Sequence, residues 1–357
     1  LGYSYFDGQR WNYVAIDGFY NITDGQHFNG DLYLSSAGYG LMNASSGSSI
    51  DIPLSSISGK VVIPNIESAS KLYIPCFEHQ TPLLTINVGG SVTEYDSDYT
   101  ITQFPTSLSL SNSETIWLTR STFDGGGIIS LDLQDDNFRV ITTADELPNN
   151  NVNSVAISQI DEAWVGTNSG LVSFNDATFI FDDFNAIEAI FNSDALFNGQ
   201  TITAVAIDGG NRVWVGTEEE GIWVFDSNLS RLDFRFTARN SPLPSNNIKE
   251  FSYNAENGEM FILTTKGLSS FRSNSSVGNF SHSEVNIFPN PVRPGFTGKV
   301  GIEGLVQNAI LKITDINGKL IREVVSNGGT ASWDLLDYNN SRVQSGVYLK
   351  YLTKTVD

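Results

Sequence analysis

The stretch Trp164-Val165-Gly166-Thr167 returns fifty positions later as Trp214-Val215-Gly216-Thr217. Each copy follows a polar turn and an apolar run, and each precedes a Gly that opens another apolar strand. A repeat of this length in a chain with little helical patterning is typical of a β-propeller, in which each repeat forms one blade. The sequence therefore predicts an all-β fold.

The same frame continues along residues 1–272, which we expect to form the propeller. Clear copies lie at 147–174, 201–225 and 243–271, and weaker copies precede them. The aromatic residues at the position of the repeated Trp are Tyr33, Tyr73, Trp117, Trp164, Trp214 and Phe261. We expect their large rings to pack between neighbouring blades.

Residues 2–11 look like the outer hairpin of one more blade whose inner strands are missing. The chain then holds six inner strand pairs and seven outer hairpins, which predicts seven blades with an incomplete first blade. Either the chain begins inside a larger protein or another segment closes the ring. We favour the first alternative.

The copies at 147–174 and 201–225 resemble the two-component-regulator propeller repeat. That repeat joins a Leu-Pro-(Ser/Asn)-Asn turn, an inner strand, an Asp-x-x-Gly turn, the Trp-(Val/Ile)-Gly-Thr strand and a Gly-opened strand. Residues 243–271 fit it with Phe261 in place of Trp, and residues 1–130 fit only loosely. The resemblance implies the fold and says little about function, because propellers host many unrelated activities.

A polar run at 273–283 reads as a linker, and a second domain is expected at 284–357. This tail opens with Phe288-Pro289-Asn290-Pro291, whose two prolines exclude a central strand. Two strands then flank the turn Asn317-Gly318, as in a hairpin. About 70 residues of alternating strands predict a small β-sandwich.

Four motifs of the tail resemble the C-terminal sorting domain of the type IX secretion system. They are Phe-Pro-Asn-Pro at 288–291, an Asp-x-x-Gly-Lys hairpin at 315–319, Trp-Asp at 333–334 and Ser-Gly-x-Tyr at 345–348. The resemblance implies export across the outer membrane and residence on the cell surface or outside the cell. One departure is the end, because such domains usually finish with a further short basic strand.

Charge is distributed unevenly over a chain whose net charge is −20. The tail holds eight Lys or Arg against seven Asp or Glu, and the remaining residues hold 12 against 33. An acidic body repels nucleic acid, so we expect no DNA or RNA partner. Solubility is the simplest interpretation of the acidic propeller, and a specific cation-binding role is the alternative.

Motifs that would indicate catalysis are missing. The sequence has no Gly-x-Ser-x-Gly elbow and no phosphate-binding Gly-rich loop, and we expect no catalytic residues and no cofactor. Three distant histidines (His27, His79 and His282) and the single Cys76 do not suggest a metal site. Carboxylate pairs for glycosidase chemistry remain an open alternative, because such pairs need not be close in sequence.

Tryptophans offer a second kind of candidate site, since their rings can stack on sugars. Trp164 and Trp214 occupy the repeat position and are interpreted as blade core. Trp11 and Trp223 lie outside that frame and are the better stacking candidates.

Three functions compete. The pairing of propeller and tail resembles a surface component of the type IX secretion machinery, with two propellers before a sorting-like domain. That resemblance implies membership of the outer-membrane attachment complex and presentation of anionic lipopolysaccharide to a partner sortase, without catalysis. The first alternative is a secreted cargo, an adhesin or a glycan-binding or glycan-active propeller, with the tail as export signal. A periplasmic kinase sensor is disfavoured by the motif at 288–291 and by the missing membrane span.

An anionic glycolipid should avoid the acidic propeller and prefer the near-neutral tail. Arginine suits phosphate because its planar guanidinium binds two oxygens at once. The candidate contacts are Arg293, Lys299, Lys312, Lys319, Arg322 and Arg342, with Lys350 and Lys354 as further members of the set. The alternative for each of these residues is that it is simply solvated.

Overall fold

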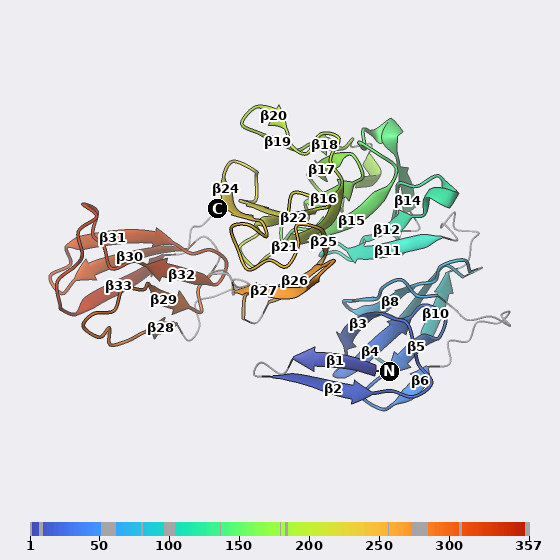
Figure 1. Ribbon diagram of the computed structural model, residues 1–357, viewed down its shortest axis with the longest axis horizontal. Coiled ribbons are helices and arrows are strands. Elements are labelled where there is room, and N and C mark those ends of the chain that lie inside the picture. The colour runs from blue at the N-terminus through green and yellow to red at the C-terminus, as the bar shows by residue number, and fades with distance from the viewer. Residues whose placement is uncertain are drawn as a thin grey trace. The chain divides into compact units, whose positions relative to one another are not determined.

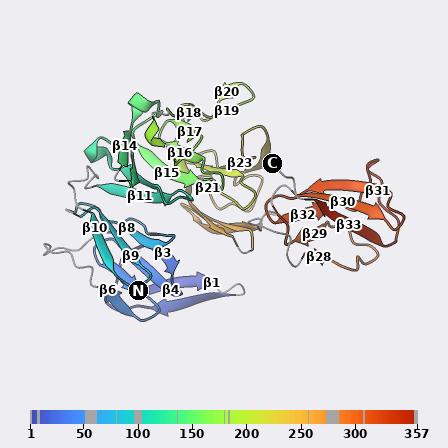
Figure 2. The same cartoon turned by 180° about the vertical axis from the view of Figure 1, so that it is seen from behind.

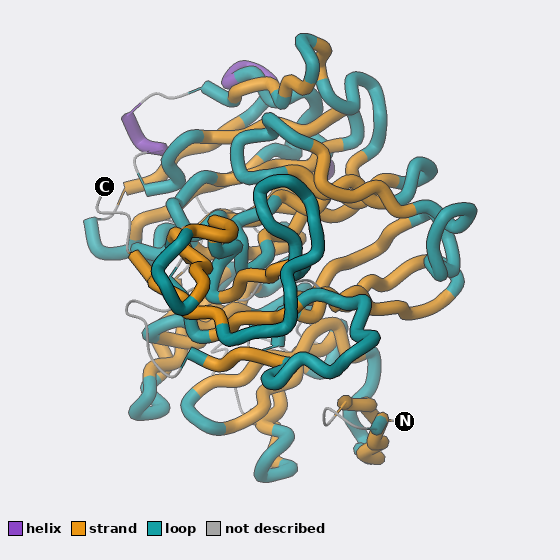
Figure 3. The backbone as a smooth tube through the Cα atoms, turned by 90° about the vertical axis from the view of Figure 1, so that its left-hand side faces the viewer, coloured by secondary structure: helices purple, strands orange, loops and turns teal. Residues whose placement is uncertain are grey.

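The regular secondary structure of the computed structural model consists almost entirely of strands, which are joined by loops and turns (Figure 3). It describes residues 2–6, 10–50, 62–79, 81–95, 104–135, 137–178, 180–182, 185–255, 257–272, 285–306 and 309–353. Within those residues the only helices are three 3-10 turns, η2 (Thr122–Asp124), η3 (Thr143–Asp145) and η4 (Ile180–Asp182). The chain divides into two compact units, Leu1–Ile202 and Thr203–Asp357. The expected linker at 273–283 lies outside the described residues.

The first unit consists mainly of antiparallel four-stranded sheets whose strands follow one another along the chain (Figure 1). A hairpin of β1 (Gly2–Phe6) and β2 (Trp11–Ala15) comes first. The first four-stranded sheet contains β3 (Ile22–Phe28), β4 (Asp31–Ser36), β5 (Gly40–Asn43) and β6 (Ser48–Ile50). The second contains β7 (Glu67–Ser68), β8 (Lys71–Pro75), β9 (Leu83–Asn87) and β10 (Val92–Tyr95), and the third contains β11 (Pro105–Leu110), β12 (Ile116–Arg120), β13 (Ile128–Asp132) and β14 (Asn137–Ile141). The fourth contains β15 (Val152–Ile157), β16 (Ala163–Thr167), β17 (Gly170–Phe174) and β18 (Ile187–Glu188).

A small hairpin that the sequence did not predict follows, formed by β19 (Ile190–Phe191) and β20 (Asp194–Ala195). The second unit begins within the next sheet. Its strands are β21 (Ile202–Ile207), β22 (Val213–Thr217), β23 (Ile222–Phe225) and β24 (Leu232–Phe236), followed by β25 (Ile248–Asn254), β26 (Glu259–Thr264) and β27 (Gly267–Arg272). All six expected pairs of inner strands are present. The sheet formed by β25, β26 and β27 has three strands among the described residues.

Trp, Gly and Thr of the repeated motif have separate structural roles, which the second copy shows for Trp and Gly. Trp214 is fully buried against Phe251 and Phe271, with ring centroids 6.0 and 5.8 Å away. Gly216 leaves room for strand β25, because a Cβ there would lie 2.7 Å from Cγ2 of Ile248. The motif therefore fixes the packing of one blade on the next.

The Thr of the motif closes the turn into the following strand. Thr167 Oγ1 donates a hydrogen bond to the carbonyl of Gly170 at 3.0 Å, and Thr217 does the same to Gly221 at 3.0 Å. Thr264, in the copy that lacks Trp, repeats the contact with Gly267 at 2.8 Å. Satisfying a carbonyl in this way stabilises a turn by about 1 kcal/mol.

The turn between β15 and β16 has the same form as the turn between β21 and β22. Backbone hydrogen bonds join Ser158 N to Glu162 O at 2.8 Å and Asp208 N to Arg212 O at 3.2 Å. In each turn the residue just before Glu162 or Arg212 adopts a left-handed backbone conformation. In the second unit the Asp208 carboxylate accepts hydrogen bonds from Nε of Arg212 at 2.8 Å and from Nε1 of Trp214 at 2.9 Å. Asp208 and Arg212 are both buried, so each charge is neutralised by the other.

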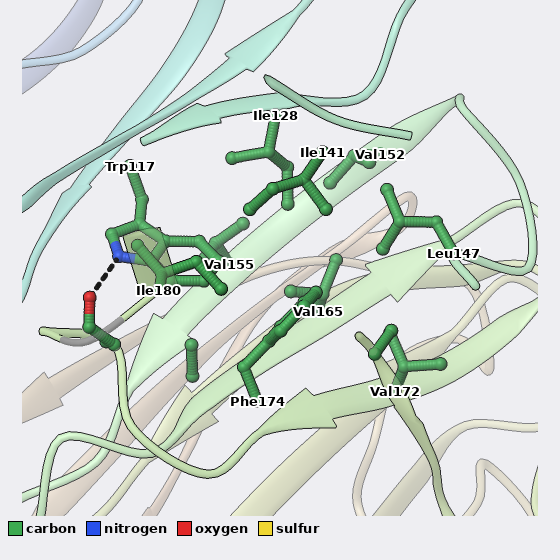
Figure 4. Packing of buried hydrophobic residues seen from close by; sticks show 13 residues of the cluster. Trp117, Ile128, Ile141, Leu147, Val152, Val155, Val165, Val172, Phe174 and Ile180 are labelled. Carbon is green, nitrogen blue, oxygen red and sulfur yellow. Dashed lines mark hydrogen bonds between the residues drawn. The ribbon is translucent and has the colours of Figure 1, made fainter. Parts of the chain in front are cut away.

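Hydrophobic side chains from neighbouring sheets of the first unit form the core shown in Figure 4. Trp117 of β12 meets Phe174 of β17 edge to face, with centroids 5.4 Å apart. Its indole Nε1 donates to the carbonyl of Ala177 at 3.3 Å. Val155, Val165 and the other aliphatic members pack around this pair. Burial of the repeat tryptophans, as predicted, is confirmed, because Trp117, Trp164 and Trp214 are at most 3% exposed.

The tail forms the predicted β-sandwich (Figures 1 and 2). One sheet has the order β28-β29-β32 and the other β31-β30-β33. The strands are β28 (Asn286–Phe288), β29 (Val300–Glu303), β30 (Ile310–Asp315), β31 (Leu320–Val325), β32 (Thr330–Trp333) and β33 (Tyr348–Thr353). Buried Ile302, Leu311, Ile313 and Trp333 belong to its core. The Asn317-Gly318 hairpin is confirmed by the pairing of β30 with β31, and Gly318 adopts a φ of 82°.

Candidate functional site

A cavity of about 770 Å³ opens in the tail between β28 and β33, which are edge strands of the two sheets. We call it the edge groove. Its lining consists of the loop 289–295, the segment 342–350, and Ile287, Val300, Trp333 and Leu335. The last three of these are buried core residues, whereas most residues of the two loops are exposed. The volume lies in the range of ordinary ligand pockets.

Both loops owe their shape to local sequence. Pro289, Pro291 and Pro294 cannot donate backbone hydrogen bonds, so the chain leaves the sheet after β28. Arg342 Nη2 donates to the carbonyl of Phe296 at 2.6 Å and ties the two segments together. Tyr348 Oη donates to the carbonyl of Gln344 at 2.6 Å and fixes the entry into β33.

The charge of the edge groove is one-sided. Arg293, Arg342 and Lys350 line it, and its lining includes no Asp or Glu among the residues that the structure describes. This is unusual in a chain with twice as many acidic as basic side chains. A groove with three cations and no carboxylate has the electrostatic character of an anion-binding site.

Lys350 occupies a core-facing position of β33. Its neighbours at alternate positions, Tyr348 and Leu352, pack against the sandwich core, and Lys350 pairs across the sheet with buried Ile313. The Lys350 Nζ is buried and has no hydrogen-bond partner within the described part of the chain. This burial lowers the pKa of Lys350 to about 8.

The structure brings together only some of the cations predicted as a binding set. Arg293 and Arg342 line the edge groove with Lys350. Lys312 forms an ion pair with Glu323 at 3.4 Å, and Arg322 donates to the carbonyl of Asp337 at 2.9 Å. The others are Lys299, exposed just before β29, Lys319, exposed beside the Asn-Gly turn, and Lys354, which lies outside the described residues.

The two tryptophans predicted for stacking differ in surroundings. Trp11 of β2 is 55% exposed. Trp223 of β23 stacks on Phe225 with an interplanar angle of 5°, and the guanidinium of Arg235 lies 4.0 Å from its ring centroid. One face of Trp223 is thus covered by a cation, which makes it a poorer sugar platform than Trp11.

A pair of carboxyl groups that sequence reasoning missed lies between neighbouring blades of the first unit. Asp24 Oδ2 of β3 accepts a hydrogen bond from the backbone N–H of Ile66 at 2.9 Å, next to Glu67 of β7. Burial, reinforced by the negative charge of Asp24, raises the pKa of Glu67 to about 8. Burial also raises the pKa of Asp24. A carboxylic acid that keeps its proton near neutrality can donate a hydrogen bond or a proton.

His79 and Cys76 are buried in separate surroundings. His79 Nδ1 accepts from the backbone N–H of Thr81 at 2.8 Å, and burial lowers its pKa. Cys76 is fully buried, which raises its pKa to about 12. Within the described ranges, no three His, Cys, Asp or Glu side chains are grouped so that they could hold a metal ion. His282 lies outside those ranges.

Comparison with known families identifies the tail. Residues 286–356 match the family described as the secretion system C-terminal sorting domain. The tail is a sorting domain. Its presence connects the chain with protein secretion and indicates a secreted or cell-surface protein. No curated protein sequence is significantly similar to the chain. The part of the chain that the structure describes contains no helix long and apolar enough to span a membrane.

Solved structures share the fold over most of the chain. PorZ of Porphyromonas gingivalis, described as an essential bacterial surface component of the type-IX secretion system, is similar over 99% of this chain with a TM-score of 0.63 and 20% identity. Extracellular domains of the BT4673 and BT3049 systems of B. thetaiotaomicron are similar over 91% and 95%, with TM-scores of 0.58 and 0.54 and identities of 16% and 18%.

The chain spans about half the length of PorZ (54%) and 40% and 45% of the two B. thetaiotaomicron chains. At these identities the likeness concerns the fold. It confirms the predicted all-β fold of a propeller followed by a β-sandwich, and it agrees with the resemblance to regulator-type propeller repeats.

Proposed function

We propose that the protein works at the outer face of the outer membrane as a non-catalytic component of the type IX secretion attachment complex. In this role it binds anionic lipopolysaccharide and presents it to a partner sortase. The observation that carries the proposal is the combination of a regulator-type propeller with a sorting domain in one chain, an arrangement shared in fold with PorZ.

Electrostatics support the tail as the lipopolysaccharide-binding part. The acidic propeller repels phosphate and carboxylate groups over a Debye length of about 8 Å at physiological ionic strength. The sorting domain lacks this negative excess, and Arg293 and Arg342 lie on the same groove. Guanidinium groups can bind phosphate oxygens in pairs, which favours Arg over Lys for this contact.

Charge reversal in the intact chain tests this assignment. We expect Arg293→Glu with Arg342→Glu to weaken binding to purified anionic lipopolysaccharide by about tenfold or more, measured by surface plasmon resonance. The matched control reverses two exposed cations of the propeller, Arg239 and Lys266, and should leave binding within about twofold. Equal losses in both variants, or a loss in the control alone, would remove the tail from the proposal.

A secreted cargo is the second candidate. Two features favour it, namely the exposed side chain of Trp11 and the raised pKa of Glu67 beside Asp24. These are the features of the propeller that could serve glycan binding or glycan hydrolysis. Binding or cleavage of a neutral glycan that is lost in Trp11→Ala or Glu67→Gln would favour the cargo over the secretion component.

A further inference from the structure

We propose that the edge groove binds an extended acidic peptide, which adds a strand beside β33 and places one carboxylate against Lys350. The inference goes beyond the proposed function and holds for either candidate, because it rests only on the sorting domain. The peptide would come from a protein partner, and its recognition would combine backbone pairing with one charge contact.

Free sheet edges provide the backbone part of the site. β33 pairs with β30 from Tyr348↔Asp315 to Thr353↔Ile310, and β28 pairs with β29 from Asn286↔Glu303 to Phe288↔Gly301. On their other sides neither strand has a partner strand among the described residues. An edge of this kind presents unpaired N–H and C=O groups that a further strand can join.

Lys350 provides the charge part. An ammonium group that is buried without a partner is unfavourable by several kcal/mol in an apolar surrounding. Lys350 is one of the residues that line the edge groove, and within the described residues the lining contains no acidic side chain that could pair with it. A carboxylate brought by a ligand would remove the penalty, and the resulting charge-assisted bond would be stronger than a neutral one.

The surroundings favour a peptide over an acidic sugar. Trp333, the tryptophan of the groove, is 3% exposed, and its ring is covered edge-on by Tyr348 with centroids 5.4 Å apart. Trp333 therefore offers no open face to a sugar ring. Leu349 and Tyr351 are exposed at alternate positions along β33, and Val347 is exposed just before it. An added strand with alternating apolar side chains would cover this pattern.

Fluorescence anisotropy with the full chain can test the inference. The probes are seven-residue Thr-Val peptides in which a single Glu is moved through the positions, each matched by its Gln counterpart. We expect one Glu peptide to bind at least tenfold more tightly than its Gln counterpart. That preference should disappear in Lys350→Met, which keeps an apolar side chain of similar length without the charge.

Lys312→Met is the matched control, because Lys312 is exposed on the same sheet and already paired with Glu323. It should leave the preference for Glu intact. Equal binding of all Glu and Gln pairs, or no binding of any peptide, would overturn the inference. So would binding of a hexuronate oligosaccharide that depends on Lys350 while the peptides stay unbound. Loss of lipopolysaccharide binding alone would bear on the proposed function and leave this inference standing.

Discussion

Replacing Lys350 by Met should stabilise the sorting domain at neutral pH, although it removes a charged residue from the surface of a pocket. Burial lowers the pKa of Lys350 from its ordinary value of 10.5 to about 8. The folded domain therefore holds the ammonium less favourably than the unfolded chain does. Below pH 8 both states are charged and the full penalty applies, and above about pH 10.5 both are neutral and the penalty vanishes.

The magnitude follows from the same two values. A pKa lowered from 10.5 to about 8 corresponds to roughly 3.4 kcal/mol at about 1.36 kcal/mol per pKa unit. Lys350 is only half-buried, and solvent screening reduces the gain expected for Lys350→Met to about 1–2 kcal/mol at pH 6–7. The gain should shrink as the pH rises from 8 towards 10.5.

Hydrogen exchange of peptides from β30 and β33, measured by mass spectrometry on the full chain, reports this local stability. Each variant is compared with the parent protein at the same pH, so intrinsic exchange rates cancel. Slower exchange in Lys350→Met at pH 6–7, and little difference in Lys312→Met, would agree with the reasoning. Faster exchange in Lys350→Met would show that the ammonium has a stabilising partner and would refute it.

Three further predictions concern the propeller. Trp117→Ala should destabilise the first unit by about 3–5 kcal/mol in urea unfolding, because it empties the core in Figure 4; a loss under 1 kcal/mol would contradict that packing. Gly216→Ala should cost about 1–3 kcal/mol, since its Cβ would meet Ile248 at 2.7 Å, and unchanged stability would mean that the blades separate without penalty. Glu67→Gln should reduce the fall in Tm between pH 4.5 and 8. The raised pKa of Glu67 means that the folded protein favours the protonated carboxyl, so the parent protein loses stability as the pH rises through this range. An equal dependence of Tm on pH in both proteins would show that Glu67 is ionised in the folded protein.

Repeats and tail motifs carried most of the fold information. The spacing of the Trp-Val-Gly-Thr copies predicted the pairs of inner strands. Trp and Gly recur at fixed positions in the sequence because both are needed where neighbouring blades touch. The hairpin β19–β20 was not predicted, because each of its strands has only two residues. Such short segments carry no usable periodicity.

The candidate site was less predictable. Arg293 and Arg342 were named from charge alone, but the groove they share depends on loops about 50 residues apart meeting at the open side of the sandwich. The burial of Lys350 depends on the register of β33, since a slip of one residue would turn it to solvent. Asp24 and Glu67 come together only because neighbouring blades pack.

Deleting the gene in the native bacterium and following the other proteins that carry a C-terminal sorting domain tests the proposed function most directly. If the protein is part of the secretion machinery, those proteins should fail to reach the cell surface, and a wild-type copy should restore them. If they reach the surface in normal amounts and only this protein is missing, the chain is a cargo and the proposal is wrong.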